Sequence, residues 1–335
     1  MPEPFDSDVA ERTEQDLLGL TDLGRADAPE LVGAQLSGTV AAELAADPTL
    51  RQAVSPALSG RKWYRGLGWG FWVAVGYVVA WILLAIFANL LPLDSPTQLY
   101  PDCFANAAPS SAHLLGCDPS GFDVFSRLIF GARVSLIVGF ASIALSQIVG
   151  GTLGIVAGYF RGWFDDLMAV VSNVFLSFPS LVLGLLIVSY VGRSLFDIVM
   201  IIAIVAWPLL YRVVRSATIE YSQREYVLAA QALGCKRSRI LWRILLPDVV
   251  PAAITYGLVG VALAIVGEGA LSFLGQSVRA PTPTWGNMIA LGSDTMPTYT
   301  SLLFAPAIAM FTFILAINFI GDRLRSLLDV REAVL

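Results

Sequence analysis

The chain is poor in charge and in the residues that carry out chemistry in enzymes. Only 14% of its 335 residues are Asp, Glu, Lys or Arg, whereas soluble domains carry about 25%. Its single histidine, His113, cannot form a metal site alone. Neither of the two lysines, Lys62 and Lys236, precedes Ser or Thr, which excludes a phosphate-binding P-loop. We therefore expect no catalytic residues, no metal and no cofactor in this chain.

Long apolar stretches take the place of charge. The chain is 56% hydrophobic, with a mean hydropathy of +0.70. A helix needs about 20 apolar residues to cross a bilayer, and six stretches approach or exceed that length with at most one charge inside each. The composition therefore predicts an all-α, polytopic membrane protein, whose six transmembrane helices are expected at about 66–91, 134–160, 167–192, 194–211, 249–278 and 295–321.

The charge that remains is unevenly distributed. Residues 1–60 contain eleven acidic and three basic residues, which predicts an acidic cytoplasmic extension before a membrane domain over 61–335. The first thirty residues lack the basic and apolar regions of a secretory signal peptide. Within the extension, Asp8–Leu18 fits either an amphipathic arm that contacts a partner or part of a solvated tail. The sequence contains no basic patch with interleaved aromatic residues, so it gives no indication of nucleic-acid binding.

Basic residues near the spans predict the orientation. Fourteen Lys and Arg residues lie on the side of the two termini and four on the other side. Cytoplasmic loops carry the excess of Lys and Arg, so we expect both termini in the cytoplasm. The outer side then receives residues 92–133, a tight turn near Arg193 and a segment over 279–294. Pro281, Pro283 and Pro297 predict that this last segment is a structured turn rather than a helix.

The longest basic interruption, residues 212–247, separates the fourth and fifth spans. Residues 221–233 have good helix formers, and Gly234 is expected to end that helix because glycine adopts positive φ cheaply. A second helix is expected over 236–245, and Pro247 suits the start of the next span. Helical spacing places Tyr226, Ala229, Ala230 and Leu233 on one face. The pattern alone fits either a docking surface or an ordinary basic loop.

The same interruption resembles the "EAA" loop of ABC importer permeases. The residues in register with that motif are Ala229, Ala230, Gly234, Ile244, Leu246 and Pro247. The family's eponymous glutamate is replaced by Leu228, and Glu225 lies one turn earlier. In that family the loop forms coupling helices that sit in a groove on the ATPase subunit. The resemblance implies that ATPase coupling involves Glu225, Tyr226, Ala229, Ala230, Gly234, Ile244, Leu246 and Pro247.

Other segments are similar to the dipeptide/oligopeptide/nickel importer permeases, and most of all to their C-type inner-membrane subunit. The external stretch His113–Arg127 matches apart from Cys117 and Phe122, which replace Thr and Arg. Residues 267–275, 283–288 and 318–325 also match, and the resemblance covers about 59–330.

This resemblance implies a multi-pass subunit of the cell (inner, cytoplasmic) membrane with the type I importer, MetI-like permease fold. The expected partners are a second homologous permease subunit, two ATPase subunits or domains, and an extracytoplasmic substrate-binding protein. ATP and Mg would be bound by the ATPase chains, so the permease would not itself be an enzyme. The expected cargo is a di- or oligopeptide, with nickel or another small solute as the alternative. An ion-coupled secondary carrier is the competing class, and it would require more ionisable residues within the spans.

Glu268 is the one internal charge of the fifth span. A charge at the bilayer centre costs about 2.5–3.5 kcal/mol on insertion scales, so Glu268 should face the protein interior or water. A hydrogen-bonding role near the pathway or a subunit interface, direct contact with substrate, and a proton relay all remain open. By contrast, the four-residue spacing of Gly150, Gly154 and Gly158 indicates close helix packing.

Cys103 and Cys117 fall in the same predicted outer loop. An oxidising compartment permits a disulfide between them, and two free or buried thiols are the alternative. Cys235, the third cysteine, lies in the predicted cytoplasmic interruption.

Overall fold

A computed structural model describes residues 68–105, 108–296 and 299–332. The chain divides into two compact units, residues 69–325 and a second unit made of residues 1–68 with 326–335. The acidic extension and the candidate arm at Asp8–Leu18 lie outside the described residues. Within the described residues the fold is helical, and only an isolated antiparallel bridge joins Cys117 to Asp123.

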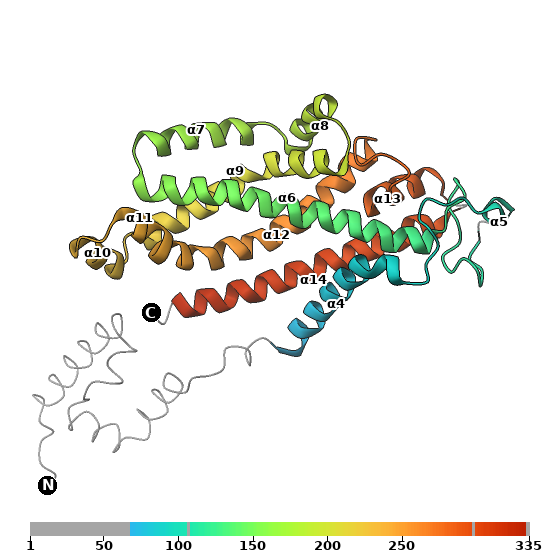
Figure 1. Cartoon of the computed structure of the whole chain (residues 1–335), viewed down its shortest axis with the longest axis horizontal. Helices are drawn as coiled ribbons and strands as arrows, with labels where there is room; N and C mark the ends of the chain where they lie inside the picture. The colour runs from blue at the N-terminus through green and yellow to red at the C-terminus, as the bar shows by residue number, and fades with distance from the viewer. Residues whose placement is uncertain (1–67, 106–107, 297–298, 333–335) are drawn as a thin grey trace, which may run out of the picture. The chain divides into compact units, whose positions relative to one another are not determined.

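The long helices of the 69–325 unit run side by side (Figure 1). Those long and apolar enough to cross a membrane are α4 (Gly68–Phe87) with the turn η2 (Ala88–Leu90), α6 (Val124–Phe160), α9 (Leu195–Tyr221), α12 (Leu246–Phe273) and α14 (Thr300–Glu332). Shorter elements gather at the two ends of this bundle. One end carries α10 (Glu225–Ala232) and α11 (Arg237–Arg239), and the other carries α5 (Pro101–Ala105) and α13 (Trp285–Asp294).

The third predicted span is broken into two helices. Residues 167–192 were expected to form one continuous helix, but α7 (Trp163–Ser177) and α8 (Ser180–Val191) meet at an angle of 90°. The break falls at Phe178, which is extended with ψ 138° and precedes Pro179. Proline disfavours the helical conformation of the residue before it, which accounts for the position of the break.

Other helix ends differ from the predicted spans in both directions: α12 ends at Phe273 rather than at 278, whereas α6 and α9 extend beyond their predicted ends. α6 begins ten residues before the predicted start at 134, and α9 continues ten residues beyond the predicted end at 211. Both extensions carry arginines, for example Arg127 and Arg215. A charge-free run marks the apolar part of a spanning helix and not its full length, because the helix continues into a polar environment.

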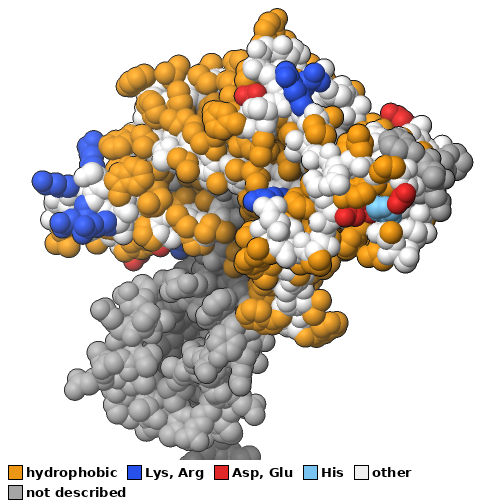
Figure 2. All heavy atoms as spheres, turned by 45° about the vertical axis from the view of Figure 1, so that its right-hand side comes forward, with side chains coloured by type: hydrophobic (Ala, Val, Ile, Leu, Met, Phe, Trp, Pro, Cys, Tyr) orange, Lys and Arg blue, Asp and Glu red, His pale blue; other side chains and the backbone are white. Residues whose placement is uncertain are grey.

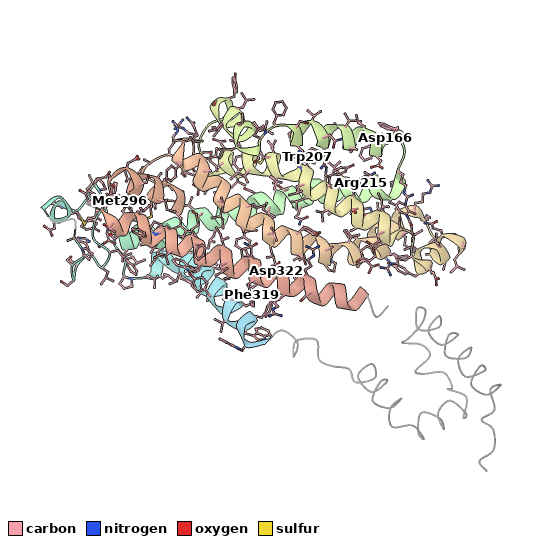
Figure 3. All side chains as sticks on the ribbon, turned by 180° about the vertical axis from the view of Figure 1, so that it is seen from behind. Asp166, Trp207, Arg215, Met296, Phe319 and Asp322 are labelled. Atoms are coloured by element: carbon pink, nitrogen blue, oxygen red, sulfur yellow. A yellow bond between two sulfur atoms is a disulfide. The ribbon has the colours of Figure 1, made fainter. Side chains whose placement is uncertain are left out.

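Helices α6 and α9 pack with their backbones in close contact. Gly150, Gly154 and Gly158 face the α9 backbone, and a Cβ atom on Gly150 would lie 2.6 Å from the carbonyl oxygen of Trp207. These glycines therefore allow the close helix packing expected of them, and the helix that they pack against is α9. On another side of α9, Trp207 and Arg215 face α7 (Figure 3), where Arg215 Nη2 donates a 2.6 Å hydrogen bond to Asp165.

The segment after α12 corrects a second prediction. Residues 279–294 were expected to be a turn, but α13 forms a ten-residue helix from Trp285. Thr284 begins it with a capping box, in which its hydroxyl accepts from the Asn287 backbone and the Asn287 side chain accepts from the Thr284 backbone. The prolines Pro281 and Pro283 precede this cap, so they shape the approach to the helix without preventing it.

Candidate functional site

The segment between α9 and α12 forms a short helix docked on the start of a long one. Residues 222–224 turn the chain, and α10 then begins at Glu225 rather than at the predicted 221. After α11, the predicted second helix continues as the π-helical segment η3 (Ile240–Leu245) directly into α12. Residues 237–273 therefore make one uninterrupted helical run.

Gly234 ends α10 as predicted. Its φ is +75°, a left-handed conformation that glycine adopts without steric cost. Two hydrogen bonds close the helix end, from the Cys235 amide to the Ala230 carbonyl and from the Gly234 amide to the Gln231 carbonyl. This is the Schellman arrangement, which satisfies carbonyls that a helix end would otherwise leave unpaired.

A small apolar cluster attaches α10 to the bundle. Val227 is fully buried there, and its companions come from α6, α9, η3 and α12: Ile155, Val214, Ile240, Leu241, Leu245 and Val249. Ile244 and Leu246, both among the predicted coupling residues, pack against this cluster. Val227 was not singled out from the sequence, although it lies three residues before Ala230 on the same helix face.

The opposite side of α10 is exposed. Leu228 is 51% exposed and Leu233 is 85% exposed. The residues predicted to couple to an ATPase that are also exposed are Glu225, Tyr226, Ala229, Gly234 and Pro247. Exposed basic side chains surround this surface, namely Lys236, Arg237, Arg239 and Arg243. Figure 2 shows Lys and Arg side chains gathered at this end, while apolar side chains cover much of the adjoining flank.

A hydrogen bond connects α10 to α12 beside this exposed face. The Tyr226 hydroxyl donates to Asp248 Oδ2 at 2.6 Å. Burial raises the pKa of Tyr226, and the Asp248 carboxylate raises that pKa further. The phenol therefore keeps its proton and remains a donor.

Glu268 is buried inside the chain at the opposite end of α12. It is fully buried, and its Oε1 accepts three hydroxyl hydrogen bonds, at 2.9 Å from Ser272, 2.6 Å from Ser277 and 2.8 Å from Thr284. These donors come from α12, the following loop and the start of α13. Glu268 therefore faces the protein interior, as its charge requires, and joins two elements of the same chain.

Trp285 fixes the start of α13 on α6. Its amide donates to Ser135 Oγ at 3.0 Å, and its indole Nε1 donates to the Leu128 carbonyl at 3.1 Å. The ring is fully buried between Trp81 of α4 and Phe313 of α14. The first turn of α13 is thus bound to four of the long helices, counting α12 through Glu268.

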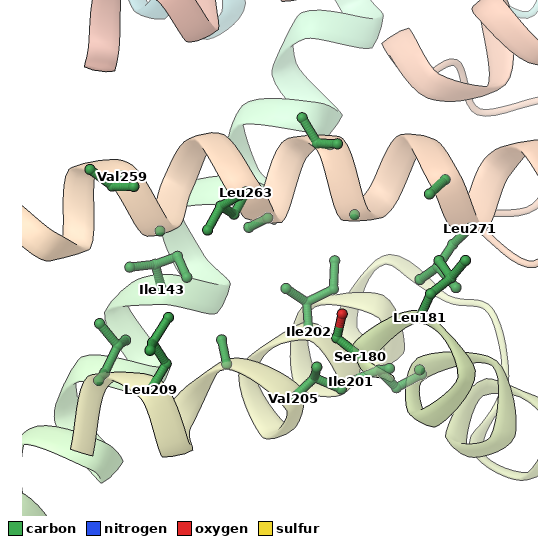
Figure 4. Close-up of a pocket in the computed structure, with 18 of the residues that line it drawn as sticks. Ile143, Ser180, Leu181, Ile201, Ile202, Val205, Leu209, Val259, Leu263 and Leu271 are labelled. Atoms are coloured by element: carbon green, nitrogen blue, oxygen red, sulfur yellow. The ribbon is translucent and has the colours of Figure 1, made fainter. Parts of the chain in front are cut away.

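A cavity of about 510 Å³ lies between α8, α9 and α12 (Figure 4). Its walls are almost entirely apolar, and Ser180 of α8 contributes a hydroxyl. Gly267 and Leu271 of α12 line it, whereas Glu268 between them points elsewhere. The volume is in the range of small-molecule sites, but the carboxylate of Glu268 is not available to anything inside it.

The segment before α6 is held by a disulfide and buried polar pairs. Cys103 and Cys117 are joined as a disulfide. His113 Nδ1 lies 3.0 Å from Asp123 Oδ1, and the other oxygen of Asp123 caps α6 by accepting from the Ser126 amide. Burial raises the pKa of Asp118, whose carboxylate accepts the backbone amides of Ser120 and Phe122.

The same segment brings together side chains of types that can ligate a metal ion. Ligand atoms of Asp94, His113 and Asp123 lie within 4.8 Å of one another. Asp123 is already engaged by His113 and by its helix cap, so these contacts explain the cluster without an ion. The arrangement does not supply a reason to assign a metal.

Sequence comparison finds close relatives among transport proteins. The family described as "Binding-protein-dependent transport system inner membrane component" matches residues 150–333. The dipeptide transport system permease protein DppC of Alkalihalophilus pseudofirmus is 37% identical over 252 residues, which cover 75% of this chain and 83% of that protein. The glutathione transport system permease protein GsiD of Pectobacterium atrosepticum is 34% identical over 269 residues, covering 80% and 89% of the two chains.

Comparison with solved structures finds a similar fold. An inward-facing structure of the MetNI methionine ABC transporter superposes with a TM-score of 0.52 at 17% sequence identity. The match covers 61% of this chain and 97% of that one. The all-α, MetI-like fold class expected from the sequence is thereby confirmed.

Proposed function

Because the chain belongs to the binding-protein-dependent transport system inner membrane components, we propose that it forms half of an ATP-driven import pathway for di- or oligopeptides. As a member of that family it is a multi-pass membrane protein, consistent with its long apolar helices. Relatives named for dipeptide and glutathione transport support a peptide cargo, since glutathione is itself a small peptide.

The observation that carries the coupling part of this proposal is the position of α10. Its buried side is fixed by Val227, and its other side presents exposed apolar and small residues such as Leu228 and Ala229 among basic side chains. This surface suits a partner with an apolar groove and an acidic rim. We assign that role to an ATPase, because this chain contains no P-loop of its own.

The proposed assembly contains four kinds of component. A second homologous permease completes the pathway, two ATPase subunits or domains lie beneath the permease pair with one of them at α10, and an extracytoplasmic binding protein delivers the cargo. ATP and Mg are held by the ATPases, and this chain holds no cofactor.

The proposed orientation places the α10 end and both termini in the cytoplasm. Seven of the Lys and Arg residues that favour this side lie between Arg212 and Arg243. The disulfide lies at the other end of the bundle, with α5 (Figure 1). A disulfide persists in an oxidising compartment, so the two observations support the same orientation.

The environment of Glu268 counts against an ion-coupled carrier. Its carboxylate is enclosed by hydroxyls of its own chain and does not line the apolar cavity. The hydroxyls engage Oε1, and Oε2 is buried without a hydrogen bond to the described residues, whereas a proton relay or direct substrate contact would require a partner group or solvent at that oxygen. ATP-driven import does not need either.

Reconstitution tests the proposal. The chain is expressed together with a homologous permease, ATPases and a binding protein from the same organism, and uptake of a labelled dipeptide and of glutathione is measured in proteoliposomes. We expect uptake that requires ATP and the binding protein and that stops when the ATPase is made inactive. Uptake that follows an ion gradient without ATP would contradict the proposal.

A further inference from the structure

The apolar contacts that attach α10 to the bundle are non-directional. Among the described residues of α10, Val227 is the buried one. The hydrophobic effect that holds Val227 is non-directional. The cluster, which Ala230 and Cys235 also contact, therefore holds α10 against the bundle without a directional contact to α12.

A directional contact is made by the residue next to Val227. Tyr226 is the residue next to Val227, and its hydroxyl donates at 2.6 Å to Asp248 Oδ2. A hydrogen bond to a carboxylate is stronger and more orientation-dependent than an apolar contact. Together the apolar cluster and this hydrogen bond hold α10 on the bundle and connect it directionally to α12.

The acceptor belongs to the helix that lines the cavity. Asp248 lies in the first turn of α12, which continues to Phe273. At 1.5 Å per residue, Asp248 and Glu268 are about 30 Å apart along that helix. Leu263 and Leu271 of the same helix line the cavity. Beside the apolar cluster that Val227 shares with Leu245 and Val249, this hydrogen bond is a directional link between the exposed helix α10 and the helix that lines the cavity.

We propose that the Tyr226–Asp248 hydrogen bond transmits rotation of α10 to α12, which makes Asp248 a positioning residue for transport. This inference rests on the proposed function, because the rotation is supplied by the ATPase on which α10 docks. It adds a residue outside the motif, since Asp248 follows Pro247 and contacts α10 through the hydroxyl of Tyr226. Val227 keeps α10 in place when the bond is lost, so the complex still assembles.

The first experiment measures coupling in the complete importer. Proteoliposomes containing wild-type protein, Asp248→Ala or Tyr226→Phe are assayed for uptake of a labelled dipeptide and for ATP hydrolysis in the same samples. We expect about a fivefold or larger fall in peptide imported per ATP hydrolysed, in line with the loss of a hydrogen bond to a charged group. Co-purification of the ATPases should be retained in Asp248→Ala.

Control variants separate the hydrogen bond from a general loss of structure. Asp248→Asn keeps an acceptor oxygen, so it should retain most of the wild-type ratio of peptide imported to ATP hydrolysed. Tyr190→Phe removes a phenol hydroxyl from a residue that is 85% exposed in α8 and should leave the ratio unchanged. The double variant Tyr226→Phe/Asp248→Ala should be no worse than either single variant, because both remove one contact. Unchanged ratios in the single variants, or additive losses in the double variant, would overturn the inference.

A second experiment needs no cargo. Spin labels at Gln231 of α10 and Val250 of α12, in a Cys235→Ser background, report the distance between the two helices in the assembled complex. We expect one narrow distribution of label-to-label distances in the protein with Tyr226 intact and a broader distribution in Tyr226→Phe. A distribution in Tyr226→Phe that is equally narrow would overturn the inference. Failure of wild-type vesicles to import the dipeptide would instead count against the proposed cargo, and the label distances would still decide the inference.

Discussion

The hydroxyl of Thr284 donates a 2.8 Å hydrogen bond to Glu268 Oε1, so the residue that caps α13 also holds α13 against α12. The same hydroxyl oxygen accepts the Asn287 amide at 3.0 Å. A hydroxyl has one donor and two acceptor sites, so Thr284 fulfils both roles at once.

Replacing Glu268 by alanine should destabilise the protein strongly. The change leaves the hydroxyls of Ser272, Ser277 and Thr284 without their buried acceptor. Each unsatisfied buried group costs about 1–3 kcal/mol, so we expect a loss of about 3 kcal/mol or more. Thermal unfolding of the purified protein measures it. Glu268→Gln keeps an acceptor oxygen and should lose much less, and equal losses in the two variants would show that the hydroxyl contacts do not matter.

Gly150 and Gly151 provide a matched pair of substitutions. A Cβ atom at Gly150 would lie 2.6 Å from the Trp207 carbonyl oxygen and 2.9 Å from the Tyr211 amide nitrogen, whereas one at Gly151 meets nothing within 4 Å. Gly150→Ala should therefore cost about 1–3 kcal/mol through overpacking. Gly151→Ala should be neutral or slightly stabilising, because alanine favours the helix. Thermal unfolding of both variants tests this, and similar melting temperatures would contradict the close packing of α6 on α9.

Substitutions at Gly234 distinguish backbone geometry from bulk. Its φ of +75° strains any residue with a side chain, yet a Cβ there meets nothing within 4 Å. Asparagine tolerates this conformation better than alanine does. If the helix end sets the docking surface, Gly234→Ala should weaken co-purification with the ATPases more than Gly234→Asn. The reverse order would indicate that side-chain volume at the docking surface decides the outcome.

The disulfide can be tested by counting reactive thiols. The chain has three cysteines, and with Cys103 bonded to Cys117 only Cys235 is free. Labelling of the unfolded protein without reductant should modify one thiol, and labelling after reduction should modify three. Opening a loop of about 15 residues costs about 3 kcal/mol in the chain-entropy treatment, so Cys103→Ser/Cys117→Ser should melt at a lower temperature. Three thiols labelled before reduction would exclude the bond.

The sequence predicted the helical fold and its family well because both depend on strong local signals. Charge-free runs located the spanning helices, and the Gly234 helix end appeared where glycine was expected. The break at Pro179 was missed because three other prolines, Pro208, Pro251 and Pro306, lie inside unbroken helices. Proline alone therefore does not predict a break in a membrane helix, where neighbouring groups can satisfy the freed carbonyl.

The site itself was predicted only in part, because tertiary contacts decide it. The motif supplied the exposed residues of α10, but Val227 is buried through partners from four elements. Glu268 was expected inside the protein, yet its donors Ser277 and Thr284 lie beyond the end of α12 and could not be paired with it from spacing. For α13, the Thr284–Asn287 cap was a signal in the sequence that the neighbouring prolines obscured.

The glycine contacts between α6 and α9 also set which helices can slide. Where a helix backbone is seated directly against another, any axial shift drives carbonyl oxygens into Cα atoms, so this seam resists shear. Other α9 residues, including Ile202, Val205 and Leu209, adjoin a cavity of about 510 Å³ that α8 and α12 also line, and a shift into that space costs little steric energy. Any rearrangement of α9 during transport is therefore expected to carry α6 with it, so that the two helices move as one rigid pair.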